Sequence, residues 1–188
     1  MPGTIRSFIA IDIENAETKR KIAAVQQLLT KTGAELKLVE TQNIHITLRF
    51  LGDITPPMIE KIFMEMQKIQ FTPFTIHIKG IGAFPDTRYP RIVWAGITEG
   101  TNQLKNIFNQ LEPRLHTLGI QPDQKGFSPH LTIARVKSGK NRAQLAEIIT
   151  KNANYEFGTI EANCLRLKKS ELTPKGPLYA TLREYCVQ

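Results

Sequence analysis

Two short segments of this 188-residue chain repeat one pattern. The segments His45-Ile46-Thr47-Leu48 and His130-Leu131-Thr132-Ile133 each hold a histidine and a threonine separated by one apolar residue. Successive side chains of a β-strand point to opposite faces, so each histidine shares a face with its threonine while the apolar residues take the other. We therefore expect two strands that each present one imidazole and one hydroxyl on an apolar backing.

Helix and strand patterns alternate along the rest of the chain. Gly33 is expected to end the first helix, Gly52-Asp53 to turn the chain, and Pro113 to kink or divide the third helix. Apolar spacing predicts helices over residues 16–32, 55–69, 102–118 and 141–151, and strands over 5–13, 36–39, 44–51, 74–81, 91–97, 130–136, 157–167 and 178–187.

A turn, a helix and further strands follow both histidine strands, which indicates two related halves. We predict an α+β fold of two pseudo-symmetric lobes, each with an antiparallel sheet and flanking helices, around a central cleft. The two His/Thr faces would line that cleft. A length of 188 residues allows one large domain or two small lobes that share a core.

Composition narrows the functional class. The net charge of +8 favours a polyanionic partner such as nucleic acid, although lysines that only keep the surface soluble would give the same balance. No apolar run approaches the roughly 20 residues of a membrane span, and the N-terminus is read as a strand, not a signal peptide. Cys164 and Cys186 are expected to form neither a metal motif nor a disulfide framework, so we expect a cytoplasmic protein.

Two imidazoles across a cleft suit in-line displacement at phosphorus. A neutral ring can take a proton from the attacking water, and a protonated ring can give one to the leaving oxygen. The hydroxyls of Thr47 and Thr132 can donate to phosphate oxygens, and Arg135 can add further donors. Strict alternation turns Arg135 away from His130, so its participation needs a bulge, a twist or a long reach.

The chain resembles a known family in several segments. These are HITLRFLG (residues 45–52), SPHLTIAR (128–135), RSFIAID near the start, GAFP…PRIVWAG (82–96) and LKKSEL…GPLYATL near the end. They are similar to the RNA 2',3'-cyclic phosphodiesterases of the 2H phosphoesterase superfamily, also known as bacterial and archaeal 2'-5' RNA ligases. The resemblance covers essentially the whole chain, and implies one domain over residues 1–188 built from two intertwined lobes.

The resemblance also implies an activity and roles for residues. It implies hydrolysis of a terminal RNA 2',3'-cyclic phosphate to a 2'-phosphate, with no metal and no cofactor. His45 would be the proton donor to the 3' oxygen and His130 the proton acceptor that activates water, with Thr47, Thr132 and Arg135 binding the phosphate. The near symmetry of the two motifs does not distinguish acid from base, so this assignment rests on the resemblance. The expected partner is RNA with a cyclic phosphate end, tRNA fragments included, bound by a monomer.

Other interpretations stay open at this point. The same ring opening by an RNA 5'-hydroxyl would make the protein a 2'-5' RNA ligase, and a cleft without turnover would make it an RNA-end-binding module. Phe127 is a candidate for stacking a terminal base, whereas Trp94 is expected in the core. His77 and His116 are expected to be structural or solvated, and no ligand spacing supports a metal site.

Overall fold

The structure is a computed structural model that describes residues 3–188. Nine strands, four α-helices and one short 3-10 helix occur along these residues. In chain order they are β1 (Ile5–Asp12), α1 (Ala16–Thr30), β2 (Leu36–Leu38), the 3-10 helix (Thr41–Asn43), β3 (His45–Ile54), α2 (Pro56–Met66), β4 (Phe74–Phe84), β5 (Ile92–Glu99), α3 (Thr101–Thr117), β6 (Leu131–Val136), α4 (Arg142–Lys151), β7 (Glu156–Ala162), β8 (Cys164–Thr173) and β9 (Gly176–Cys186). No helix in this part of the chain is both long and apolar enough to cross a membrane.

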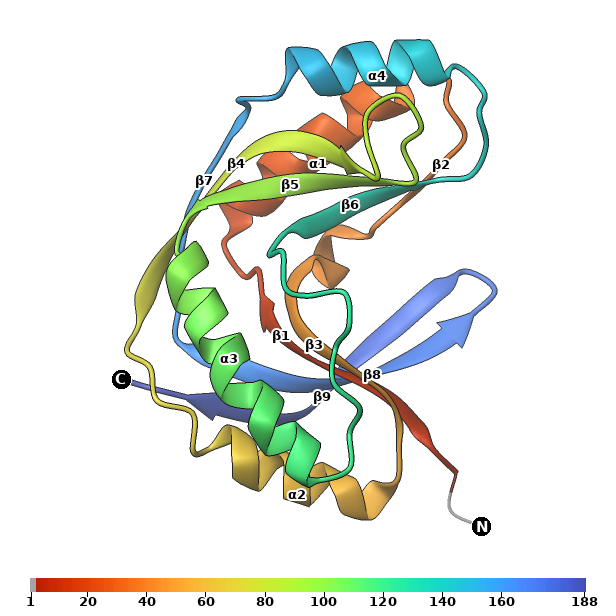
Figure 1. The fold of residues 1–188 in the computed structure, drawn as a ribbon. Coiled ribbons are helices and arrows are strands. Elements are labelled where there is room, and N and C mark those ends of the chain that lie inside the picture. The colour runs from red at the N-terminus through yellow and green to blue at the C-terminus, as the bar shows by residue number, and fades with distance from the viewer. Residues whose placement is uncertain (1–2) are drawn as a thin grey trace.

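All nine strands belong to one antiparallel sheet that curls into two halves (Figure 1). The order β7-β4-β5-β6-β3-β1-β8-β9 places the two histidine strands, β3 and β6, at the centre, and β2 pairs with β6. β3 and β6 pair at one position, where Ile46 lies opposite Leu131. The junction between the two halves of the sheet therefore lies inside the two repeated motifs.

The helices cover the sheet in two pairs that do not follow the order of the chain. α1 packs with α4 on the half that contains β6 and β7, although it directly follows β1 of the other half (Figure 1). α2 and α3 pack together on the half that contains β3 and β9. One hydrophobic core includes Ile22 of α1 and Ile62 of α2 and so runs through both halves. The bilobed α+β architecture predicted from the sequence is confirmed, with lobes that exchange their helices.

Local sequence signals account for most helix ends. The Asn15 side chain accepts a hydrogen bond from the backbone of Thr18 at the start of α1, and Gly33 follows its end with a φ of 76° that favours glycine. Thr55 and Pro56 open α2, as expected. α3 continues through Pro113, so the expected division of this helix is wrong. The five buried residues of its apolar face hold both sides of the proline against the core.

Two strand predictions also need correction. The segment predicted as one strand over residues 157–167 is two strands: β7 pairs with β4 at one end of the sheet, and β8 pairs with β1 in the other half. Apolar residues alternate on both sides of Asn163, so the sequence pattern does not show that the chain crosses from one half of the sheet to the other at this residue. Gly52 does not turn the chain either, because β3 continues to Ile54 across an irregular pairing with β1.

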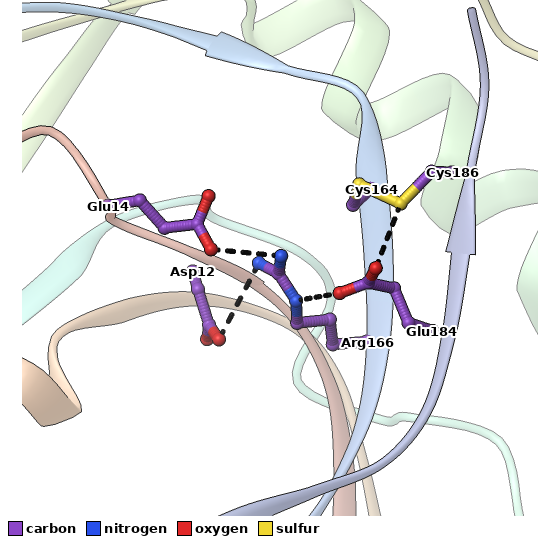
Figure 2. The surroundings of a disulfide bond; sticks show 6 residues. All are labelled: Asp12, Glu14, Cys164, Arg166, Glu184 and Cys186. Atoms are coloured by element: carbon purple, nitrogen blue, oxygen red, sulfur yellow. Dashed lines mark hydrogen bonds and ion pairs between the residues drawn. A yellow bond between two sulfur atoms is a disulfide. The ribbon is translucent and has the colours of Figure 1, made fainter.

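Cys164 and Cys186 form a disulfide, contrary to the expectation from the sequence. The two residues are 22 positions apart, but β8 and β9 form a hairpin in which Cys164 lies directly opposite Cys186. In Figure 2 the disulfide lies beside Glu184, and Arg166 lies between Glu184, Glu14 and Asp12. The hairpin is therefore closed covalently where its two strands end, and charged pairs join it to β1.

Candidate active site

The four polar residues of the two motifs meet at the junction of β3 and β6. Because Ile46 pairs with Leu131 in an antiparallel register, His45 is placed opposite Thr132, and Thr47 opposite His130. Ile46 and Leu131 are fully buried, whereas the four polar side chains are partly exposed on the other face. We call this face of the central strands the open face. It gathers two imidazoles and two hydroxyls, as strand alternation predicted.

Both imidazoles are oriented by the same kind of contact. Nδ1 of His45 lies 2.7 Å from the carbonyl oxygen of Asn43, and Nδ1 of His130 lies 2.8 Å from that of Ser128. A carbonyl oxygen can only accept a hydrogen bond, so Nδ1 carries the proton in each ring. Nε2 is then the nitrogen that is free to exchange a proton. In His45 it lies 2.8 Å from the Thr47 hydroxyl.

An irregularity of β6 brings Arg135 to the same face. Val93 pairs with Ala134 but Trp94 pairs with Thr132, so Ile133 is an extra residue on β6. Ile133 and Ala134 are consequently both buried, and Arg135 is exposed on the side of Thr132. Strict alternation would turn Arg135 away from His130, and this bulge returns it to the face of the histidines.

The first motif carries the same irregularity. Ile9 pairs with Arg49 while Ala10 pairs with Thr47, so Leu48 is the extra residue on β3. Leu48 and Arg49 are both buried, and Phe50, which occupies the position equivalent to Arg135, is 62% exposed on the open face. Sequence reasoning missed Phe50, because its place on this face depends on a bulge that alternation does not predict.

The two histidines differ in their neighbours. His130 faces the edge of Phe84, whose ring centroid lies 4.9 Å away. His45 contacts the rings of Phe8 and Tyr179, and a buried lysine lies nearby: Lys168, opposite Phe8 on β8, places its ammonium 2.7 and 2.8 Å from the two carboxylate oxygens of Asp12. The near symmetry of the motifs is thus broken by what surrounds them.

These neighbours set the electrostatics of His45. Burial lowers the pKa of its imidazole below the usual histidine value, and Lys168 and His130 lower it further. The hydrogen bond to Asn43 and the carboxylate of Asp12 act in the opposite direction. In the free protein, the charged form of this ring is therefore disfavoured.

Tyr179 is a second residue that sequence reasoning did not single out. It lies on β9, opposite Ser170, and its ring is nearly perpendicular to that of His45, with the ring centroids 5.4 Å apart. Burial raises the pKa of its hydroxyl, against the opposing effect of Arg135 and Arg6. The phenol therefore stays protonated at neutral pH and can donate a hydrogen bond. Its only signal in the sequence is its place in the segment GPLYATL.

The remaining candidate residues lie in other surroundings. Phe127 stacks on Phe108 of α3 at 4.8 Å, so a base could reach only its other face. Trp94 is half-buried, contacts Phe84, and has a buried indole N–H without a hydrogen-bond partner within residues 3–188. His77 lies on β4 and contacts Glu156 of β7 and Thr98 of β5.

Within residues 3–188, the open face holds no cluster of three possible metal ligands. In the described part of the chain, three possible metal ligands gather at Cys164, Glu184 and Cys186, whose two sulfurs are already bonded to each other. A groove of about 860 Å³ lies elsewhere, between residues 67–72 and α3. The candidate site is therefore defined by its converging side chains.

The support behind His130 can be tested at Gly82. A Cβ atom at this position would lie 2.2 Å from the Trp94 ring, and Trp94 contacts Phe84, which contacts His130. Gly82→Ala is expected to destabilise the protein by about 1–3 kcal/mol, as overpacking does, and to lower kcat/KM by up to about 10²-fold through a displaced imidazole. Urea denaturation and hydrolysis rates measure the two effects. Gly139→Ala, at a site where an added Cβ comes no closer than 4.0 Å to a neighbouring side chain, is the control, and equal behaviour of the two variants would contradict the prediction.

Both halves of the chain, and its fold as a whole, are similar to known proteins. The model of the LigT-like phosphoesterase family matches twice, over residues 11–94 and 96–179, and each match contains one motif. The RNA 2',3'-cyclic phosphodiesterase of Methanocaldococcus jannaschii is 38% identical over 181 residues, which cover 96% of this chain and 100% of that protein. The protein of the same name from Aeropyrum pernix is 37% identical over 164 residues, covering 87% and 93%.

Solved structures share the fold. Escherichia coli LigT complexed with 3'-AMP superposes with a TM-score of 0.79 at 20% identity, covering 98% of both chains. TT0787 of Thermus thermophilus superposes with a TM-score of 0.77 at 26% identity, covering 96% of this chain and 97% of that one. The two-lobed arrangement around a central pair of strands is therefore common to these proteins.

Proposed function

Because this chain belongs to the LigT-like phosphoesterase family, we propose that it hydrolyses RNA 2',3'-cyclic phosphate ends to 2'-phosphomonoesters. The relatives that it matches over nearly their whole length carry the name of this activity. The observation that supports the proposal most directly is the junction of β3 and β6, where two imidazoles, each held through Nδ1, and two hydroxyls share one open face.

In the proposed reaction, water attacks phosphorus while Nε2 of His130 accepts its proton. The bond from phosphorus to the 3' oxygen breaks, and Nε2 of His45 gives a proton to that oxygen. The product holds a 2'-phosphate and a free 3'-hydroxyl. Thr47, Thr132 and Arg135 donate hydrogen bonds to the non-bridging oxygens, which gain charge as the attack proceeds. Histidines on two facing strands suit this geometry, since attack and departure occur on opposite sides of phosphorus.

The donor role of His45 places a condition on substrate binding. Burial lowers the pKa of this imidazole in the free protein, so a donor must gain its proton when the substrate binds. The negative phosphodiester supplies the reason, because an opposite charge close to an imidazole raises its pKa. Exclusion of water by the bound ribose strengthens that interaction.

We extend the proposal to the setting of the reaction. One chain supplies all the residues of the candidate site, so a monomer of one domain over residues 1–188 can carry out the chemistry. The substrate would be an RNA fragment with a cyclic phosphate end, such as a broken tRNA, in the cytoplasm. Phe50 and the free face of Phe127 are candidates to contact its terminal base.

The test uses a short RNA of defined sequence that ends in a 2',3'-cyclic phosphate, incubated with the protein in EDTA. The expected product is the 2'-phosphate, formed at the same rate with and without EDTA, since no step of the proposal uses a metal ion. A 3'-phosphate product would reverse the assignment of the leaving oxygen, and loss of activity in EDTA would require a metal. A second RNA with a 5'-hydroxyl, added to the same reaction, reports 2'-5' ligation if a joined product appears.

A further inference from the structure

Two cations face each other on the open face without a counter-charge. Lys37 of β2 lies directly opposite Arg135 of β6. Like charges at such a position, with Cβ atoms about 5 Å apart, destabilise a sheet. Within residues 3–188, neither side chain forms an ion pair. Both are exposed, so they can accept an anion from solution.

The position of this pair continues the line of the candidate active site. β3 leaves β6 after the single pair Ile46–Leu131, and β2 takes its place beside β6. The bulge in β6 puts Arg135 on the face of Thr132, and Lys37 shares that face because it pairs with Arg135. Going outward along β6 from His130, the open face therefore presents Thr132, then Arg135, with Lys37 alongside.

The β8–β9 hairpin borders the pair from the opposite side. The position that a Cβ at Gly176 would take lies 3.6 Å from Cε of Lys37, and the Asn43 side chain donates to the carbonyl of Pro177 at 3.3 Å. Tyr179 of the same hairpin lies within electrostatic reach of both Arg135 and Arg6. Arg6 likewise forms no ion pair in the described part of the chain, although Asp53 lies opposite it on β3. Two of the cations near Tyr179, Arg6 and Arg135, are therefore without an ion-pair partner in the described part of the chain.

We propose that Lys37, beside Arg135, binds the internucleotide phosphate next to the cyclic end, so that the protein prefers an oligonucleotide to a mononucleotide. The inference rests on the proposed function and names its substrate more closely. The cyclic phosphate is held by the His/Thr pairs and Arg135, which leaves Lys37 free for another anion. In an RNA substrate the next anion is the phosphodiester on the 5' side, and a mononucleoside cyclic phosphate with a free 5'-hydroxyl has none.

The test compares two substrates, a nucleoside 2',3'-cyclic phosphate and a trinucleotide with the same cyclic end. In Lys37→Gln, the ratio of kcat/KM for trinucleotide over mononucleotide is expected to fall about five- to tenfold, mainly through a higher KM. The dependence of log KM on log salt for the trinucleotide should lose about one unit of slope, as removal of one phosphate contact predicts. Lys37→Arg should restore most of the ratio. Lys31→Gln, at an exposed position beyond α1, should leave the ratio at the wild-type value.

An equal ratio in the wild type and in Lys37→Gln would overturn the inference. A separate measurement tests the inference without turnover. It compares the equilibrium binding of the 2'-phosphorylated trinucleotide and of the nucleoside 2'-phosphate to the wild type and to Lys37→Gln. If the wild type hydrolyses neither cyclic substrate, the proposed function fails. The phosphate site would still be supported by a loss of trinucleotide binding in Lys37→Gln, and contradicted if that binding is unchanged.

Discussion

Replacing His130 by alanine is expected to lower kcat/KM for a cyclic-phosphate RNA by about 10² to 10⁴-fold, and His45→Ala should cause a loss of similar size. Each ring carries its proton on Nδ1, so Nε2 is the atom whose removal matters in both variants. Initial rates on a defined RNA measure the effect. His77→Ala, which removes a histidine at the opposite side of its lobe, is the matched control and should keep full activity.

The two losses are expected to differ when the leaving group changes. A phosphodiester with a p-nitrophenolate leaving group needs no proton donor, because that anion is stable by itself. His45→Ala should therefore lose much less activity on such an ester than on the cyclic phosphate, whereas His130→Ala should lose as much on both. The opposite result would make His45 the base and His130 the acid.

The pH dependence follows from the lowered pKa of His45. A proton donor must be protonated, so kcat/KM should fall as pH rises through this pKa, at a pH below the usual histidine range. If His45 were the acceptor, kcat/KM would instead rise with pH in that same range. Lys168→Met removes a charge that lowers this pKa, so the alkaline limb should move to higher pH.

The largest expected effect on stability is at Glu112. Arg49 is 6% exposed, and its guanidinium contacts the Glu112 carboxylate of α3 and the carbonyls of Phe50 and Gln121. Glu112→Ala would leave a buried cation without its counter-charge and is expected to lower the free energy of unfolding by about 3 kcal/mol. Urea denaturation at neutral pH measures this loss.

A matched pair on the surface provides the control for this stability measurement. Glu17 pairs with Arg20 on the exposed side of α1, and Glu17→Ala should leave the free energy of unfolding nearly unchanged. A comparable loss in both variants would mean that water reaches the Arg49 guanidinium. Because Arg49 sits in the bulge of β3, Glu112→Ala should also weaken activity through Phe50, its exposed neighbour on that strand.

The part of the site that strand alternation controls could be predicted from the sequence. The shared face of His45 and Thr47, and of His130 and Thr132, needs only a period of two. Arg135 and Phe50 could not be assigned in this way, because each follows an extra residue that shifts the period and that leaves no mark in the sequence. The extra residues, Leu48 and Ile133, can be identified only from the register in which β3 and β6 pair with their neighbouring strands.

The fold shows the same division between local and long-range information. The ends of α1 and α2 follow from Asn15, Gly33 and Pro56, whose effects are local. The Cys164–Cys186 disulfide and the break at Asn163 depend on which strands become neighbours. Pairings of that kind are decided by packing across the whole chain, which short sequence windows do not contain.

The exchange of helices between the lobes has a consequence for how such a protein can arise. Each half of the chain, the length of a single family match, packs against a helix from the other half: α3 contacts β3, and α1 contacts β6 and β7. Two identical chains that exchanged helices in this way would form a symmetric dimer with identical histidines. When both copies lie in one chain, the sequence of each can change independently. Lys168 can then lie near His45 while Phe84 contacts His130. The different surroundings of His45 and His130 therefore require two copies of the motif that can differ in sequence.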